Sequence, residues 1–272
     1  MAQWKTELIP PAPRIAVDHL GDGKLVVFLH GIGGNRGNWH DQLPEFGRHF
    51  HALSWDARGY GMSDDYEGPL DFHDFAGDLV RVLDHFGARK AHLVGLSMGG
   101  VISMDFFALY PDRTATLTIC DSLPGFGDLT PAQREEFIRL RKEPLMQGKE
   151  PRDIAPVVAR TLISKSAVPG AFERLVGSMS ALHKQSYIKT IEGMANCGFS
   201  AELEKIRVPA HVVVGEDDIL TPPWLSRLMA QKIPGAQLSV IKNAGHLANI
   251  EQPQAFNEPV LAFLLEHRDA AV

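Results

Sequence analysis

The segment Val94-Gly95-Leu96-Ser97-Met98-Gly99-Gly100 constrains the fold of this chain more than any other. It places Ser97 between glycines, after an apolar run of strand length (Ala91–Leu96) and before a helix-like stretch (residues 101–110). A Gly-x-Ser-x-Gly sequence at such a junction makes a sharp turn that lifts the serine hydroxyl above the sheet edge. The glycines leave room for the adjoining strand and helix, and they adopt backbone angles that other residues resist. The segment therefore predicts an accessible serine at the carboxyl end of a strand.

So short a pattern also arises by chance in a chain with 25 glycines, so the elements around it must support it. Apolar runs of strand length alternate with helical patterns of 10–15 residues, which indicates βαβ units and a parallel sheet. The run at 25–30 is apolar nearly throughout, as in a strand buried on both faces. The expected strands are 25–30, 51–56, Ala91–Leu96, 115–120, 210–214 and Gln237–Ile241, and the expected core helices are 72–86, 101–110, Pro223–Lys232 and 253–268.

This alternation stops near Pro124. From about residue 128 to residue 197 only helical patterns occur, at 131–141, 153–163, 171–179 and 181–194, separated by breakers that include Pro144, Pro151 and Gly170. A helical insertion between strands of an α/β core predicts a lid over the active edge. We therefore expect a mostly parallel central sheet flanked by helices, with a helical cap inserted after the fourth parallel strand. The predicted domains are a core of residues 1–123 and 202–272 and a cap of residues 124–201.

The composition narrows the class of protein and of partner. Apolar residues make up 44% of the chain and charged residues 22%, as in ordinary globular enzymes. A net charge of −6 disfavours nucleic acid as a partner, and the longest apolar runs are too short to span a bilayer. The sequence starts without a signal-like apolar stretch, and its two cysteines, Cys120 and Cys197, lack metal-like spacing. We expect a cytoplasmic protein with free thiols, no metal, and no membrane or nucleic-acid partner; a homodimer stays open.

A serine hydroxyl is a poor nucleophile near neutral pH, so it needs a base and an acid that orients the base. In the chain order Ser–Asp–His, the acid and the histidine each follow a later strand. Gly215-Glu216-Asp217-Asp218 follows one expected strand, and Asn243-Ala244-Gly245-His246 follows the next. Both segments should reach the carboxyl edge of the sheet, where Ser97 also lies. The sequence therefore predicts a catalytic triad of Ser97, His246 and Asp218.

The acid has alternatives. Asp218 is preferred because it stands fourth in its segment, directly before the loop turns back. Asp217 is the second candidate. Asp121, which follows an earlier expected strand on the same edge, is the third.

An oxyanion hole is expected beside the serine, because negative charge develops on the carbonyl oxygen during nucleophilic attack. One backbone N–H donor should be that of Met98, directly after Ser97 at a helix N-terminus. The other should be that of Ile32, in the glycine-rich loop His30-Gly31-Ile32-Gly33-Gly34. Such a loop can also cradle a phosphate, but no Gly-Lys-Ser/Thr follows it here.

The substrate-binding residues are not identified by the sequence. The apolar side chains of the cap divide between its own core and the pocket wall, and their pattern does not show how. The cap also offers cations to a charged substrate, and the sequence does not choose among them: Arg134, Arg139, Arg141, Arg160, Lys165 and Lys184.

The serine, acid, histidine and oxyanion segments, together with residues 56–63 (Asp-Ala-Arg-Gly-Tyr-Gly-Met-Ser), resemble the α/β-hydrolase superfamily over nearly the whole chain. The resemblance implies the α/β-hydrolase fold and a serine hydrolase that needs no metal or organic cofactor. A narrower resemblance, in residues 96–100, 118–122 and 245–253, is to the 3-oxoadipate enol-lactonase branch. Those enzymes hydrolyse a lactone with a serine triad under a small helical cap.

The predicted function is hydrolysis of a carboxylic ester or lactone of a small molecule through an acyl-enzyme. Three alternatives stay open: a hydrolase of carbon–carbon bonds in ring-fission products, a cofactor-free perhydrolase or haloperoxidase, and a receptor that uses the fold to bind a ligand. Dehalogenases and soluble epoxide hydrolases need an aspartate at the nucleophile position, and Ser97 excludes that route.

Overall fold

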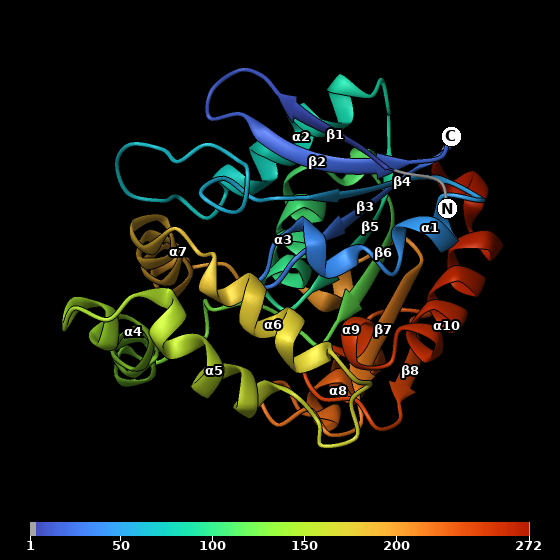
Figure 1. Ribbon diagram of the computed structural model, residues 1–272. Coiled ribbons are helices and arrows are strands. Elements are labelled where there is room, and N and C mark those ends of the chain that lie inside the picture. Colours follow the sequence, from blue (N-terminus) through green and yellow to red (C-terminus); the bar gives the residue numbers. More distant parts are fainter. Residues whose placement is uncertain (1–3, 272) are drawn as a thin grey trace.

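Residues 4–271 are described in a computed structural model (Figure 1); residues 1–3 and 272, the outer ends of the two predicted core segments, lie outside the described part. Within it, eight strands form one sheet in the order β1-β2-β4-β3-β5-β6-β7-β8. The strands from β4 to β8 in this order pair in parallel, and β1 and β2 pair antiparallel at one edge. The prediction of a mostly parallel sheet is confirmed. The strands are β1 (Lys5–Ile9), β2 (Ile15–Leu20), β3 (Leu25–Leu29), β4 (His51–Trp55), β5 (Ala91–Leu96), β6 (Thr114–Cys120), β7 (Ala210–Gly215) and β8 (Gln237–Ile241).

The antiparallel strands β1 and β2 are absent from the sequence prediction. Strand β1 carries Lys5, Thr6 and Glu7, and most of its side chains are exposed. An edge strand of this kind is held by backbone pairing to one neighbour, so its sequence need not be apolar. The parallel strands β3, β5, β6 and β7 are buried at every position, which is why their apolar runs stand out.

The order of the strands creates the place for a site. Strand β3 pairs with β4 on one side and with β5 on the other, so the chain reverses its direction of travel across the sheet at β3. Ligands of open α/β sheets bind at such a switch point, outside the carboxyl ends of the strands. The Leu29–Gly95 pair brings the loop after β3 beside the turn after β5.

Helices cover the sheet (Figure 1). Helix α3 packs on β3, β5 and β6 and against α2, while α8 packs on β7 and β8. No helix within residues 4–271 is both long and apolar enough to cross a membrane. The helices are α1 (Leu43–Phe46), α2 (Asp74–His85), α3 (Met98–Leu109), α4 (Pro131–Met146), α5 (Pro151–Leu162), α6 (Ala171–Ser180), α7 (Lys184–Asn196), α8 (Pro223–Lys232), α9 (Ala248–Glu251) and α10 (Pro253–Glu266), with short 3-10 turns at Arg36–Trp39, Pro111–Arg113, Leu203–Lys205 and Arg268–Ala271.

Helices α4 to α7 lie between β6 and β7 in the chain and form the cap on one side of the molecule (Figure 1). The predicted insertion of a helical cap after the fourth parallel strand is confirmed. The largest difference from the prediction is in the first cap helix: α4 continues past Arg141 to Met146 and contains Pro144. The ends of the other cap helices differ from the prediction by at most three residues. Proline removes the N–H that would bond the carbonyl of Leu140. Leu140 is 56% exposed, so solvent can reach this part of the helix and the lost bond costs less.

The turn that carries Ser97 depends on two glycines. A Cβ atom on Gly95 would lie 2.2 Å from the carbonyl oxygen of Gly99, and one on Gly99 would lie 2.2 Å from that of Leu29. Both contacts are with backbone atoms, which cannot rotate away. Strand β5, the start of α3 and the end of β3 therefore approach so closely that no side chain fits between them.

We predict that Gly99→Ala lowers the free energy of unfolding by about 3 kcal/mol or more, because the helix must move off the sheet to admit the methyl group. Gly177→Ala is the matched control, since Gly177 lies inside α6, where a methyl group would meet no atom of the surrounding structure within 4 Å. It should stabilise the protein by about 0.5–1 kcal/mol. Urea denaturation of both variants checks the pair, and equal effects would contradict the close approach.

Candidate active site

Ser97 occupies a strained backbone conformation between β5 and α3. Its φ is 53° and its ψ is −114°, a region that non-glycine residues rarely adopt. Such strain persists only where the surroundings enforce it. Here the Ser97 amide donates to the carbonyl of Cys120 at 2.9 Å, and the Ser122 hydroxyl donates to the Ser97 carbonyl at 2.7 Å. The end of β6 thus holds the serine from the neighbouring strand.

His246 and Asp218 form a buried pair. Their Nδ1 and Oδ2 atoms are 2.9 Å apart, and the side chains are only 6% and 0% exposed. The Thr221 hydroxyl donates to the same carboxylate oxygen at 2.6 Å, and the amides of Leu220 and Thr221 donate to the other oxygen. Burial raises the pKa of Asp218, but the hydrogen bonds from His246 and Thr221 outweigh it and hold that pKa below its ordinary value. The carboxylate is therefore ionised, and with Nδ1 donating to it the Nε2 atom of His246 is left as a base.

Ser97 and His246 line the same small cavity, together with Ile32. The three loops that follow β5, β7 and β8 thus bring the predicted nucleophile, acid and base to one edge of the sheet. Along the chain, Asp218 lies 121 positions after Ser97, and His246 lies 28 positions after Asp218.

The two alternative acids have other partners. Asp217 accepts a hydrogen bond from the hydroxyl of Ser164 in the cap at 2.6 Å. Asp121 is fully buried after β6, and its Oδ1 accepts from the amide of Gly215 at 2.7 Å. Burial and the nearby charge of Asp218 raise the pKa of Asp121 well above its ordinary value, which disfavours the ionised form that would orient a histidine. The geometry therefore favours Asp218 as the partner of the histidine.

The two residues predicted to donate to an oxyanion, Ile32 and Met98, both lie beside Ser97. Met98 is the first residue of α3, so its N–H has no acceptor within the helix. Ile32 lies in a loop that turns back on itself, where the Gly34 amide donates to the Gly31 carbonyl at 2.9 Å. His30 supports this loop as a neutral group: its Nε2 accepts from the amide of Ala57, its Nδ1 lies 2.8 Å from the Gly31 carbonyl, and burial lowers its pKa.

Glu251 holds the histidine loop to the cap, a role that its sequence context does not predict. Its buried carboxylate accepts hydrogen bonds from the amides of Gly245 at 2.8 Å and Leu247 at 3.0 Å, on either side of His246. It also accepts from the amide of Ser164, just past the end of α5, at 2.7 Å. The His246 amide itself donates to the carbonyl of Leu162 in the cap at 2.8 Å. The base is therefore positioned by core and cap together.

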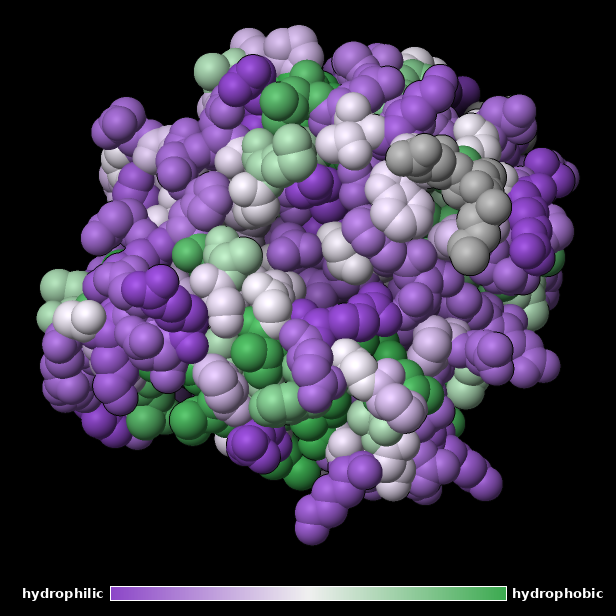
Figure 2. All heavy atoms as spheres, viewed as in Figure 1, coloured by the Kyte–Doolittle hydropathy of each residue, from purple (hydrophilic) through white to green (hydrophobic). Residues whose placement is uncertain are grey.

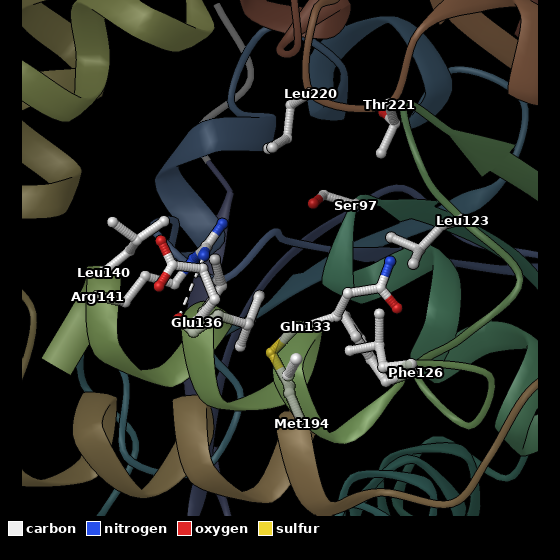
Figure 3. Close-up of a pocket in the computed structure, with 14 residues that line it drawn as sticks. Ser97, Leu123, Phe126, Gln133, Glu136, Leu140, Arg141, Met194, Leu220 and Thr221 are labelled. Carbon is white, nitrogen blue, oxygen red and sulfur yellow. Dashed lines mark hydrogen bonds between the residues drawn. The ribbon is translucent and has the colours of Figure 1, made fainter.

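A larger pocket of about 550 Å³ opens above Ser97 (Figure 3). Its wall is mostly apolar, with Leu123 and Phe126 from the start of the cap and Met194 from α7. Leu140 and Leu220 also line it and are 56% and 46% exposed, so its mouth is apolar as well. On the face shown in Figure 2, hydrophobic residues gather in the lower part, where Figure 1 places α5, α6 and α8. The apolar wall of the pocket above Ser97 suits a small molecule with an apolar body.

Within residues 4–271, no three His, Cys, Asp or Glu side chains are grouped so that they could hold an ion. Both cysteines are buried free thiols.

Comparison with known proteins identifies the family. A family model described as alpha/beta hydrolase fold matches residues 24–253. The chain is 26% identical over 251 residues to 3-oxoadipate enol-lactonase 2 of Acinetobacter baylyi, with 89% of each chain covered. It is 28% identical over 260 residues to a Mycobacterium tuberculosis protein provisionally named non-heme bromoperoxidase BpoC, covering 92% of this chain and 97% of that one. A malate-bound structure of a thermophilic esterase from Thermogutta terrifontis superposes with a TM-score of 0.87 at 28% identity, covering 98% and 99%.

The chain belongs to the alpha/beta hydrolase fold family. The resemblance to this superfamily and to its enol-lactonase branch is confirmed, and the protein is a hydrolase.

We predict that Glu251→Gln destabilises the fold by about 2–4 kcal/mol, because an amide nitrogen would face backbone N–H groups that need an acceptor. Amide hydrogen exchange should accelerate at Ser164, Gly245 and Leu247 more than elsewhere. Glu258→Gln, on the exposed face of α10, is the control and should leave both stability and exchange unchanged. Unaltered exchange at the three amides of Glu251→Gln would contradict the role of this carboxylate.

Proposed function

We propose that the protein hydrolyses a carboxylic ester or lactone of a small molecule through an acyl-enzyme, with Ser97 as nucleophile, His246 as base and Asp218 as the acid that orients it. The observation that carries this proposal is the buried 2.9 Å contact between His246 and Asp218 at the sheet edge where the strained Ser97 lies. No metal or organic cofactor is part of the proposed reaction.

The reaction has two steps. His246 Nε2 takes the proton of the Ser97 hydroxyl as its oxygen attacks the substrate carbonyl, and the N–H groups of Ile32 and Met98 stabilise the oxyanion. Collapse of the tetrahedral species breaks the ester bond, and His246 returns the proton to the leaving alcohol. A water molecule activated by His246 then attacks the acyl-enzyme, releasing the carboxylic acid and regenerating Ser97.

Ester or lactone cleavage is favoured over the alternatives by what the similar proteins are called. One relative is named an enol-lactonase and one structural neighbour an esterase. The apolar pocket beside Ser97 suits the acyl chain of such a substrate. A perhydrolase is the second candidate, because another relative bears the provisional name of a bromoperoxidase. Peroxide-dependent halogenation in acetate, measured beside ester hydrolysis, distinguishes the two.

We predict that Ser97→Ala lowers kcat for p-nitrophenyl esters by about 10⁴-fold or more, since no other group can form the acyl-enzyme. Alanine is small enough for the turn, so circular dichroism and the melting temperature should show an intact fold. Substantial activity of the folded variant would reject Ser97 as the nucleophile.

The acid is tested by three matched substitutions. Asp218→Asn should lower kcat by about 10⁴-fold, because the histidine loses the carboxylate that fixes its tautomer. Asp121→Asn should change kcat by less than about threefold, because the amide oxygen can still accept from the Gly215 amide while Asp218 keeps its bond to His246. Asp217→Asn should cost less than about tenfold, because its amide oxygen can still accept from Ser164. A larger loss at residue 217 or 121 than at residue 218 would move the acid there.

The cap boundaries at residues 124 and 201 and the cytoplasmic location stay predictions. Whether the protein forms a homodimer stays open.

A further inference from the structure

Two charged residues line the large pocket, Glu136 and Arg141, both from α4. The carboxylate of Glu136 is turned to Arg139 on the exposed side of the helix. Its two oxygens accept from the Arg139 guanidinium at 2.8 and 2.9 Å, so this carboxylate already has an ion-pair partner. Arg141 is therefore the charge that the pocket presents to a ligand.

Arg141 has no carboxylate within ion-pair distance among residues 4–271. Its guanidinium lies over the ring of Phe137, 4.0 Å from the ring centre, and donates to the Phe137 carbonyl at 3.4 Å. Burial lowers its pKa from the ordinary value, and the nearby hydroxyl of Tyr187 opposes this change. An arginine stays charged in a protein, so the pocket holds a partly buried cation without a counter-ion.

The other cations of the cap are placed differently. Arg139 is paired with Glu136 and Glu143, and Lys184 with Glu150. Arg160 lies over the ring of Phe172, and Arg134 lines a separate cavity on the outside of α4. Lys165 is exposed in the segment after α5. The structure thus distinguishes among cations that the sequence leaves equivalent.

We propose that Arg141 binds a carboxylate of the substrate, so that the preferred ester or lactone of this enzyme has an apolar body and one negative charge. The inference rests on the hydrolase function proposed above. A planar guanidinium recognises a carboxylate through two parallel N–H···O bonds. The mostly apolar walls lower the local dielectric constant, which strengthens that attraction.

The position of Arg141 relative to Ser97 fits this role. In Figure 3, Arg141 and Leu140 lie on one side of Ser97, and Leu123 and Phe126 lie on the other. The reacting carbonyl can therefore sit at the serine while the charged end points along α4 and the uncharged group meets the apolar side. Because Arg141 lines the pocket and bonds to Phe137, while His246 bonds to Asp218, we expect it to affect which substrate binds and not the proton transfer.

The test compares charged and neutral esters of equal length. Mono-p-nitrophenyl succinate, glutarate and adipate carry a free carboxylate, and their methyl esters do not. The wild type should hydrolyse the charged member of at least one pair with a kcat/KM about tenfold higher or more. Arg141→Met should lower kcat/KM for that ester by about 30-fold or more and leave the neutral ester within about threefold. Arg141→Lys, a point charge without the planar fork, should fall between them.

Arg134→Met is the matched control, because it removes a cation of the same helix that lines a separate cavity on the outside of α4. It should match the wild type on both esters. A wild type that prefers the neutral ester at every length, or an Arg141→Met variant that keeps the preference for charge, would overturn the proposal. Melting temperatures of all variants show that the comparison is between folded proteins.

Binding without turnover separates this inference from the hydrolase proposal. Isothermal titration of glutarate and adipate into Ser97→Ala should give binding of at least one of them that Arg141→Met in the same background weakens about tenfold or more. If the wild type hydrolyses no ester, the acyl-transfer function is wrong, and the titration alone decides whether Arg141 forms a carboxylate site. Equal binding of the diacids with and without Arg141 would reject that site.

Discussion

The close approach of α3 to the sheet is the constraint on which the site depends. The first turn of the helix lies against the end of β3, with space at Gly99 for a hydrogen atom and nothing larger. That approach places the N-terminus of a twelve-residue helix directly behind Ser97 and forces the serine into its strained conformation. The positive end of the helix then faces the point where the reaction would build negative charge. Geometry, strain and electrostatics at Ser97 follow from one packing contact.

The cap is part of the site and not merely a cover. The segment after α5 bonds to the histidine loop through Leu162, Ser164 and Glu251, and Ser164 also bonds to Asp217. These contacts join the end of α5 and the segment after it to the loops after β7 and β8. Helix α4, by contrast, contributes pocket residues and contacts mainly α7. One region of the cap therefore supports the proposed chemistry, while another shapes the space for the substrate.

The parts of the structure that could be predicted from the sequence are those with a strong local signal. Runs such as Leu25–Leu29 are apolar at each position because both faces of the strand are buried, and the glycines around Ser97 mark a turn that only they allow. The loops that carry Asp218 and His246 could be placed because parallel strands end at one edge.

Structural features that depend on residues far apart in the sequence could not be predicted. Strand β1 has the polar sequence of a loop and is a strand because β2 pairs with it. In the sequence, Glu251 does not differ from other carboxylates near helix ends. Only the folded chain brings three backbone amides within hydrogen-bond distance of it. The same limit applies to Arg141, whose lack of a counter-ion is a property of its surroundings.

The Glu251 junction has a consequence for how enzymes of this shape can be altered. A foreign cap grafted between β6 and β7 would have to supply an amide where Ser164 lies and a carbonyl where Leu162 lies, or the histidine loop would lose its support. Helix α4 is not part of these contacts with the histidine loop. Variation that changes substrate preference can therefore accumulate in α4 first, while the stretch between α5 and α6 changes slowly.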